Sequence, residues 1–317
     1  MRTANSRDTI QTAGYRQLFL KLPANSTKQS NFFETVFFGK PATHKYLPIN
    51  SYVIADDEII VNKYVDEDTA VVARYKTADI TGGHPEKISE QVISKKFLLG
   101  TDAFGRDIFS RIIIGTRVSI LVGLIAVIIS LTIGILFGAL AGFYRGKTDA
   151  FIMWLVNVTW SIPTLLLVFA ITLALGKGFW QIFIAVGLTL WVSVARLVRG
   201  QVMAVKELEY VQAARALGFR DSRIILRHIL PNIIGPIMVI AAGNFATAII
   251  IEAGLSFLGI GVQPPQPSWG LMIKENYNLI ITHNAVQALI PGVAIMLLVL
   301  AFNLLGSGLR DALDVKG

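Results

Sequence analysis

Long stretches without a charged side chain constrain this chain more than any other feature of its sequence. Only 16% of the 317 residues are charged, against about 25% in soluble domains, and the deficit falls after residue 117. A transmembrane helix needs roughly 20 mostly apolar residues to cross the hydrocarbon core of a bilayer. We therefore predict an all-α polytopic membrane protein. Its five transmembrane helices are expected at about 118–143, 150–176, 178–196, 230–252 and 286–308.

A further uncharged stretch, 253–273, is not expected to span the membrane. It contains four Gly and three Pro residues, so a lipid-exposed helix there would leave backbone groups unpaired. We predict a loop or a re-entrant segment at one membrane surface. Asn157, Ser161 and Pro163 interrupt the second predicted span and are candidates for facing a pore.

Basic residues determine the expected orientation of these helices. The stretch 196–227 holds seven Lys or Arg residues against three acidic residues. Short loops rich in Lys and Arg stay in the cytoplasm, so this loop and the C-terminus are predicted to be cytoplasmic. Topology thus explains the net charge of +8, and nucleic-acid binding is not expected. The chain contains no Cys, which excludes disulfides and Cys-based metal sites.

Residues 1–98 are predicted to form an extramembrane segment of unknown role. The stretches 46–65 and 69–77 mix Val, Ile and Tyr with polar residues, which is typical of short strands. Counting spans back from the cytoplasmic loop places this segment outside, yet its first ten residues lack the apolar core of a signal peptide. We favour a transmembrane helix upstream of residue 1. The alternative is that the first span translocates the segment.

The loop 210–231, YVQAARALGFRDSRIILRHILP, has a regular pattern between two predicted spans. Tyr210, Ala214 and Leu217 recur at helical spacing and predict one apolar helical face. Gly218 is expected to end this helix, because helix ends often adopt the left-handed backbone that glycine tolerates.

A second short helix is expected in the same loop. Asp221 or Ser222 is predicted to cap it. Pro231 suits the first turn of the following span, where its missing N–H has no intrahelical partner to lose. A helix, a break, a second helix and a return to the membrane suit a loop that another protein binds.

This loop resembles the cytoplasmic EAA loop of ABC-importer permeases, whose pattern is E-A-A, three residues, Gly, nine residues, then I-x-L-P. Gln212, Ala213 and Ala214 stand at the E-A-A positions, and Gly218 stands at the glycine. Gln212 departs from the pattern, since it replaces Glu with an uncharged side chain that still forms hydrogen bonds. His228 replaces Ile, and His-x-Leu-Pro is similar to the peptide-importer form of the loop.

Three other segments are similar to the same subfamily, in the same order. LGTDAFGRDIFSRIIIGTRVS (99–119) resembles the segment that leads into a core span, and LSFLGIGVQPPQPSWGLMI (255–273) resembles an outward-facing segment. PGVAIMLLVLAFNLLGSGLRDALD (291–314) resembles the last span and tail. Over about 99–317 the chain resembles a permease subunit of dipeptide/oligopeptide/nickel-type ABC importers, the partner that carries the LGTD-x-x-GRD segment. The resemblance predicts a type I importer core in this range.

The resemblance implies a pore-forming subunit that couples ATP hydrolysis by partner subunits to alternating access. The expected partners are a second permease subunit, two cytoplasmic ATPase subunits, an extracytoplasmic solute-binding protein and the lipid bilayer of a bacterial or archaeal plasma (inner) membrane. The chain lacks G-x-x-x-x-G-K-[ST], so it is not expected to be an enzyme. No cofactor is expected on this chain, because ATP and magnesium would bind the ATPase subunits.

The helix 207–217 and its glycine turn are expected, from the resemblance, to enter a cleft on an ATPase subunit. The residues expected to carry this contact are Glu209, Gln212, Ala213, Ala214, Arg215, Gly218 and Pro231. The alternative is a basic loop that lies on anionic headgroups, at about 1 kcal/mol for each basic residue. That alternative explains the charge but not the order of Ala, Ala and Gly.

A second group of polar residues is expected at the outer membrane surface. It consists of Asp102, Arg106, Asp107, Arg111 and Glu252. Glu252 lies at the outer end of a predicted span, where water is expected to reach it, and a structural partner (Arg111 or Arg117) is as favoured as a substrate contact. We interpret the network as architecture first and as a docking site for a binding protein second.

Two other classes of protein compete with the importer. A secondary, ion-coupled transporter would need inverted repeats and an ion site near the midplane, and the sequence has no internal repeat or buried carboxylate pair. A membrane enzyme would need a nucleophile and base or a metal cluster, and no metal site is predicted. Dipeptides, longer peptides, glutathione-like molecules and nickel chelates all stay open as solutes.

Overall fold

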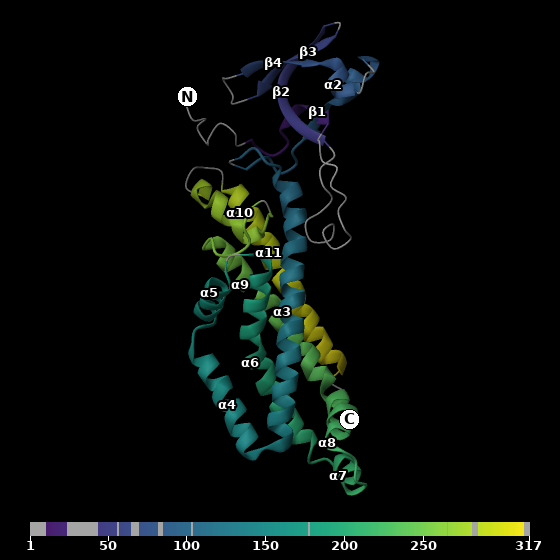
Figure 1. Ribbon diagram of the computed structural model, residues 1–317, viewed down its shortest axis with the longest axis vertical. Coiled ribbons are helices and arrows are strands. Elements are labelled where there is room, and N and C mark those ends of the chain that lie inside the picture. The colour runs from purple at the N-terminus through teal and green to yellow at the C-terminus, as the bar shows by residue number, and fades with distance from the viewer. Residues whose placement is uncertain are drawn as a thin grey trace. The chain divides into compact units, whose positions relative to one another are not determined.

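The computed structural model describes residues 11–23, 44–55, 57–64, 70–81, 85–102, 104–176, 178–264, 266–280 and 285–313 (Figure 1). The chain divides into two compact units. One comprises Met1–Ile114 with Glu275–Gln287, and the other comprises Gly115–Lys274 with Ala288–Gly317. Residues 99–114, which were expected to belong to the permease core, group with the first unit. They do so because their side chains and backbone bond to Glu275 and Gln287. Pro265 and the tail after residue 313 lie outside the described residues.

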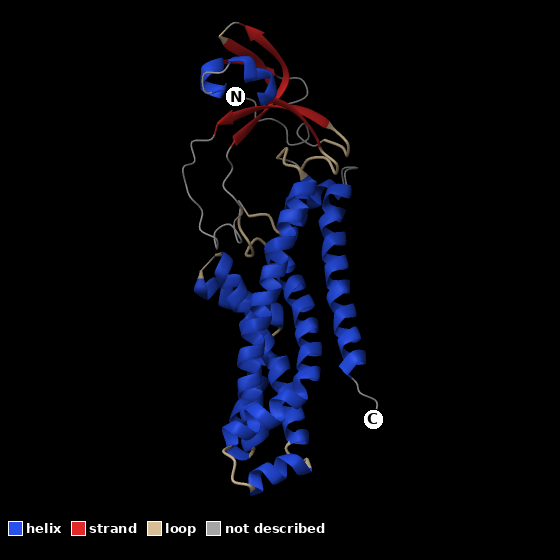
Figure 2. Ribbon diagram, turned by 90° about the vertical axis from the view of Figure 1, so that its right-hand side faces the viewer, coloured by secondary structure: helices blue, strands red, loops and turns tan. Residues whose placement is uncertain are grey.

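An antiparallel five-stranded sheet organises the first unit (Figure 2). Its strands are β1 (Arg16–Pro23), β2 (His44–Ala55), β3 (Glu58–Tyr64), β4 (Ala70–Lys76) and β5 (Val92–Lys96). In space the strands follow the order β4-β3-β2-β1-β5. The short helices α2 (Thr77–Thr81) and η1 (Pro85–Gln91) connect β4 to β5.

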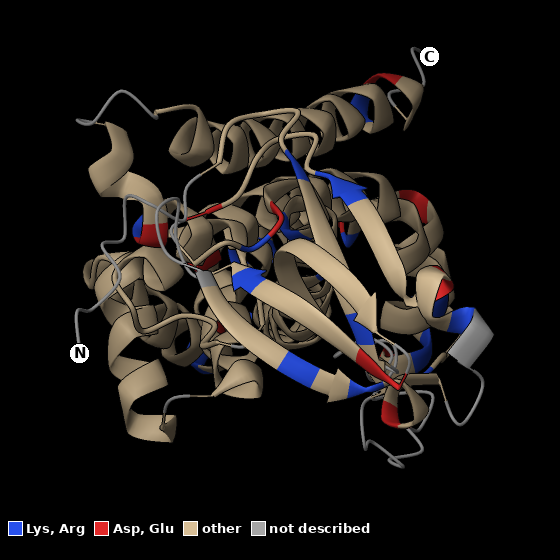
Figure 3. Cartoon of the chain, turned by 90° about the horizontal axis from the view of Figure 1, so that it is seen from above, with Lys and Arg blue, Asp and Glu red and all other residues tan. Residues whose placement is uncertain are grey.

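One face of this sheet is buried because apolar residues alternate along the strands, and successive side chains point to opposite faces. Leu20 of β1 pairs with Leu47 of β2, and both contribute to a core that Ile80 and Ile88 of the short helices complete. The strands carry eight Lys or Arg residues and one acidic residue, Glu58. Figure 3 shows these basic positions distributed along the strands.

Four helical stretches of the described chain are long and apolar enough to cross a membrane. They are α3 (Ile108–Tyr144), α6 (Phe179–Val205), a stretch over Asp221–Phe257 that ends with α9 (Ile234–Phe257), and α11 (Val286–Leu313). These four coincide with four of the predicted spans. Each of the four stretches also extends past at least one predicted end.

The second predicted span is not one continuous helix. It consists of α4 (Gly146–Ser161) and α5 (Thr164–Leu175), which are bent by 94° where they meet. Pro163 causes the break, because it has no N–H to donate and excludes the helical conformation from the residue before it. Ile162 accordingly has an extended backbone, with φ −92° and ψ 129°. The described part of the chain therefore has five spans only if this bent pair counts as one.

The third predicted span was expected to end at residue 196, but α6 continues to Val205. Polar residues of α4 accept hydrogen bonds from two arginines in this last part of α6. Arg199 donates to both carboxylate oxygens of Asp149, at 2.5 and 2.6 Å. Arg196 donates to Asn157 Oδ1 at 2.7 Å and lies 3.4 Å from the centre of the Trp160 ring. Asn157, a candidate for facing a pore, thus binds an arginine of α6.

The packing of α3 against α6 depends on a row of glycines on α3. A Cβ atom at Gly138 would lie 2.6 Å from the carbonyl oxygen of Ala195, and one at Gly142 would lie 2.7 Å from that of Arg199. A Cβ atom at Gly134 would lie 2.5 Å from the Cβ atom of Val194. Three glycines spaced by four residues therefore let the two backbones approach closely. Figure 1 shows α3, α6 and α9 side by side.

The stretch 253–273, predicted not to span, begins as the last turn of α9 and then leaves the helix. Residues 258–268 form a loop among the described positions, and α10 (Trp269–Asn276) and the single turn η4 (Tyr277–Ile280) follow it. Gly259 has a φ of +83°, a left-handed conformation that favours glycine. Because of this break, the segment contains no helix of membrane length in its described part.

Candidate functional site

The loop between α6 and α9 contains a short amphipathic helix, α7 (Glu209–Ala216). Val211 and Ala214 are buried, with 3% and 4% of their surface exposed, and pack in one cluster with Phe143 and Ile224. Of the three residues of the predicted apolar face, only Ala214 is buried. Tyr210 and Leu217 are 42% and 74% exposed, because the helix turns Val211, and not Tyr210, towards the bundle.

Gly218 ends α7 in the predicted left-handed conformation, with a φ of +77°. The N–H of Gly218 donates to the carbonyl of Arg215 at 3.0 Å, and the N–H of Phe219 donates to that of Ala214 at 3.2 Å. These two bonds form a Schellman motif, which satisfies carbonyls that a helix end leaves unpaired. No atom lies within 4 Å of a Cβ built on Gly218. The glycine is thus required by its conformation and not by lack of space.

The second short helix, α8 (Asp221–Ile224), starts one residue earlier than predicted. Arg220 is its N-terminal cap residue, and no side chain caps it. Asp221 lies inside the first turn instead, where its negative charge still favours the positive end of the helix dipole. The predicted cap at Asp221 or Ser222 is therefore wrong, while the helix itself exists.

The chain returns from α8 to α9 without leaving a helical path. A π-helical turn (Ile225–Ile229) and a 3-10 turn (Leu230–Ile233) lead into α9. Pro231 was predicted in the first turn of the span. It lies instead in the 3-10 turn that comes directly before α9. His228 stacks on Phe219 with ring centres 5.9 Å apart, and its carbonyl accepts from Asn232 at 2.6 Å. The His at this position therefore joins the two arms of the loop.

The outward surface of this loop contains most of the residues expected to contact an ATPase. Glu209, Gln212, Ala213, Arg215, Gly218 and Pro231 are exposed. Ala214 is the exception, because it faces the bundle. Of the two adjacent alanines, one is therefore available for close contact with a partner and the other packs inside.

The expected outer network is present in part, within the first unit. Asp102 is 1% exposed and accepts from the backbone N–H groups of Phe104 and Arg106, both at 2.9 Å. Its other oxygen accepts from Arg106 Nε at 2.8 Å and from Arg111. Glu275, which was not predicted, accepts from Arg106 at 2.5 Å and from Arg111 at 2.9 Å. Two carboxylates and two guanidinium groups thus form one cluster.

Asp107 and Glu252, which were expected in this network, have other partners. Asp107 bonds to Ser110 at 2.5 Å and lies 3.4 Å from Lys95. Glu252 is fully buried in α9 and accepts from Ser256 Oγ at 2.6 Å, which in turn accepts from the N–H of Val262 at 3.0 Å. Water does not reach Glu252 as expected, because the helix continues past it and the 258–268 loop folds onto its end.

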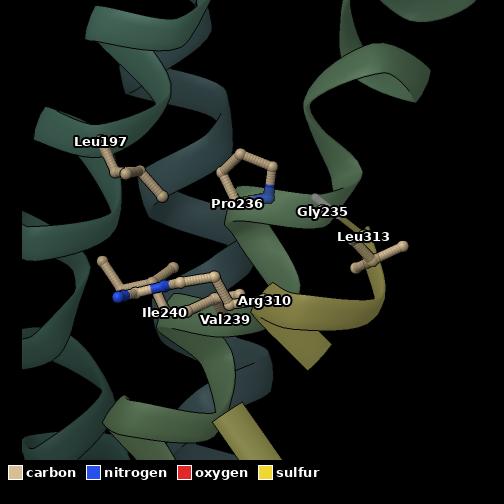
Figure 4. Close-up of a pocket in the computed structure, with 7 residues that line it drawn as sticks. All are labelled: Leu197, Gly235, Pro236, Val239, Ile240, Arg310 and Leu313. Carbon is tan, nitrogen blue, oxygen red and sulfur yellow. The ribbon is translucent and has the colours of Figure 1, made fainter. Parts of the chain in front are cut away.

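An apolar cavity of about 520 Å³ lies between α6, α9 and the last turns of α11 (Figure 4). It is lined by Leu197, Gly235, Pro236, Val239, Ile240, Arg310 and Leu313. Of these described residues only Arg310 is charged. The lining offers no carboxylate for the amino group of a peptide, so we do not assign the solute to this cavity.

A bundle of membrane-length helices, with a helix–turn–helix loop exposed between α6 and α9, defines a multi-pass membrane permease. Residues 134–316 match the family described as the inner membrane component of binding-protein-dependent transport systems. The chain belongs to this family. It is the membrane permease component of an ABC transporter, not the ATPase, and a component of this kind works with an ATPase and a binding protein.

Curated relatives support the same assignment. The chain is 44% identical over 219 residues to the glutathione transport system permease protein GsiD of Pectobacterium atrosepticum, covering 69% of this chain and 72% of that protein. It is 42% identical over 223 residues to the oligopeptide transport system permease protein OppC of Bacillus subtilis, covering 70% and 73%. The dipeptide transport system permease protein DppC of the same organism is 41% identical over 217 residues, 68% of each.

A solved structure shows the fold. The inward-facing MetNI methionine ABC transporter superposes with a TM-score of 0.54 at 19% identity, covering 65% of this chain and 97% of that chain. The helices of the second unit therefore have the arrangement of an ABC-importer permease.

Proposed function

We propose that this chain is a pore-forming permease subunit of an ATP-driven importer of peptides or related small solutes. One observation carries the coupling part of the proposal: α7 buries Val211 and Ala214 while it exposes Gln212, Ala213 and Arg215. Because its inner face packs against the bundle and its outer face is exposed, α7 can transmit the movement of a bound partner to the transmembrane helices. The solute class is supported by relatives named for glutathione, oligopeptide and dipeptide transport.

The proposed complex contains a second permease subunit, two ATPase subunits on the cytoplasmic side and a solute-binding protein on the other side. The basic loop and the C-terminus face the cytoplasm, since short loops rich in Lys and Arg stay there. ATP and magnesium bind the ATPase subunits, and this chain binds neither. Closure of the ATPase dimer moves α7, and the population of the complex shifts between inward-open and outward-open states.

The polar cluster of Asp102, Arg106, Arg111 and Glu275 has a supporting role in this proposal. Its four side chains are paired with one another and with the backbone. Such a cluster holds the chain before α3 in one conformation. Docking of a binding protein at this cluster is the second interpretation. We place no solute contact at Glu252, whose carboxylate is enclosed by its own helix and the following loop.

The experiment that tests the proposal is uptake by the reconstituted complex. Proteoliposomes with the two permeases and two ATPases receive a radiolabelled dipeptide on its binding protein. We expect uptake with enclosed ATP and magnesium, and none with a non-hydrolysable analogue, whatever the proton or sodium gradient. Uptake driven by an ion gradient without ATP would instead assign the chain to the secondary transporters.

A further inference from the structure

A polar cavity of about 540 Å³ is lined by residues of α7 and of the turn between α3 and α4. Figure 1 shows these elements at one end of the bundle. Four charged residues line the cavity: Arg145 from the turn between α3 and α4, Lys206 and Glu207 from the turn after α6, and Arg215 from α7. The transport function proposed above places Gln212 and Arg215, which line this cavity, on the coupling surface, but it assigns no ligand to the cavity.

The charges in the cavity are unequal. Arg145 Nη2 donates to Glu207 Oε1 at 2.7 Å, so these two residues offset each other. Lys206 and Arg215 both lie near the Phe143 ring, at 5.0 and 5.9 Å from its centre. Lys206 Nζ also donates to the Phe143 carbonyl oxygen at 2.6 Å. Two cations therefore converge on one buried ring, and the cavity lining offers them no second carboxylate.

The electrostatic environment of Lys206 agrees with this geometry. Burial lowers its pKa, and the nearby positive charges of Arg145 and Arg215 lower it further. Glu207 and Asp221 attract the ammonium group but do not reverse the direction. An anion in the cavity would oppose this lowering, because an opposite charge stabilises the charged lysine.

The surplus of positive charge in the cavity coincides with a departure from the EAA sequence pattern. Gln212 lines the same cavity and stands at the position where the EAA pattern has Glu. Its side-chain Nε2 donates to the Glu207 carbonyl oxygen at 3.3 Å. A glutamate of nearly the same shape would bring a carboxylate to this wall. The departure from the pattern and the surplus of positive charge therefore occur at one place.

The backbone at the mouth of the cavity is held in an unusual conformation. Arg145 has a φ of +55°, and it is the single non-glycine residue with positive φ in the described part of the chain. Strained conformations of this kind persist where surrounding contacts enforce them, and they concentrate at functional sites. Here the strain accompanies a guanidinium group that bonds to Glu207 and lines the cavity.

We propose that this cavity binds a phosphate group, with Lys206 and Arg215 as its principal contacts and Arg145 at its edge. Arginine and lysine are the usual phosphate-binding side chains, and an arginine presents parallel N–H groups to the oxygens. The phosphate comes either from an anionic phospholipid headgroup or from a free phosphate ion. Basic pockets beside transmembrane helices are common lipid headgroup sites. Since Gln212 and Arg215 belong to α7, a bound phosphate joins the coupling helix to the end of α3.

The test is a binding titration on the full-length chain, purified and held in zwitterionic nanodiscs. The probes are inorganic phosphate, the soluble lipid dihexanoyl-phosphatidylglycerol, and dihexanoyl-phosphatidylcholine as a lipid without net charge. Saturable binding of phosphate and of phosphatidylglycerol supports a site for a phosphate group with net negative charge, whether free or on a lipid. Binding of phosphatidylglycerol alone assigns the phosphate to a lipid. Equal binding of the two lipids, or no binding of any probe, overturns the proposal.

The variants place the site. Gln212→Glu adds a carboxylate to the cavity at nearly constant volume, and we expect it to weaken binding about tenfold or more, as does Arg215→Gln. Arg227→Gln is the matched control, because it removes an exposed cation of the same loop outside the cavity. Its affinity should stay within about twofold of the original chain. If Gln212→Glu and Arg227→Gln bind alike, the phosphate lies elsewhere and the assignment is wrong.

Discussion

The backbone N–H of Phe219 donates to the carbonyl oxygen of Ala214 at 3.2 Å, across the left-handed residue between them. This bond reverses the chain at the end of α7, so that the second arm of the loop returns towards the membrane. In the helix that this turn ends, Ala214 is buried and Ala213 is exposed. The turn therefore fixes where the coupling surface ends and where the chain leads back to α9.

Gly218→Ala should weaken this turn through the backbone alone. A side chain at a φ of +77° costs about 1–2 kcal/mol, although space for it exists. We expect a lower free energy of unfolding in a denaturant titration, and fewer solute molecules imported for each ATP hydrolysed. Gly200→Ala is the matched control, since Gly200 lies in α6 with ordinary φ and open space around it. If the ratio of solute uptake to ATP hydrolysis is unchanged in Gly218→Ala, the turn does not couple the ATPase to the transmembrane helices.

Gly138→Val should disrupt the seam between α3 and α6. The added Cβ would lie 2.6 Å from the carbonyl oxygen of Ala195, which belongs to a helix backbone and moves little. Overpacking of this kind costs about 1–3 kcal/mol or more. We expect a lower melting temperature in detergent and poor recovery of the folded chain. Gly308→Ala, at an open position of α11, should behave as the original chain. Normal stability of Gly138→Val would show that the helices are farther apart.

Asp149→Asn should loosen α4 from α6. Both oxygens of Asp149 accept from Arg199 in a bidentate pair, at 2.5 and 2.6 Å. Loss of hydrogen bonds to a charged group costs about 1.5–3 kcal/mol. A double-mutant cycle with Arg199→Gln, read by unfolding free energy, should give a coupling energy of about 1 kcal/mol or more. Strictly additive effects would contradict a direct interaction.

Asp102→Asn should open the segment before α3. The variant keeps the size of the side chain but removes the charge that faces Arg106 and Arg111. Breaking a buried ion pair costs about 3–5 kcal/mol. Hydrogen exchange measured by mass spectrometry should speed up at the N–H groups of Phe104 and Arg106, which donate to Asp102. Asp107→Asn, which removes a charge beside the exposed Lys95, should change exchange there far less. If Asp102→Asn and Asp107→Asn speed up this exchange equally, Asp102 does not hold the segment before α3.

The sequence was sufficient to predict four continuous helices, the glycine turn and the non-spanning segment, because each depends on local composition. The sequence was insufficient where contacts between residues far apart in the chain determine the structure. Glu275 joins Arg111 from 164 positions away, and no local spacing indicates such a pair. The phase of α7 was assigned from Tyr210, Ala214 and Leu217, but the position of the bundle determines which side is buried. Glu252 was expected to face water because an acid usually ends a span, yet Ser256, one turn later, accommodates it inside the helix bundle.

Contact between the outer face of α7 and an ATPase subunit is what the proposed coupling requires. The chain has no cysteine, so Ala213→Cys, labelled with a benzophenone maleimide, provides a single photo-crosslinking site on that face. Ala174→Cys is the control, because it is exposed on α5, which lies well away from α7 in Figure 1. In the assembled complex we expect irradiation to attach the labelled Ala213→Cys variant to an ATPase subunit, and the labelled Ala174→Cys variant to none. If the probe on Ala213→Cys attaches only to lipid or to the binding protein, α7 is not the coupling element.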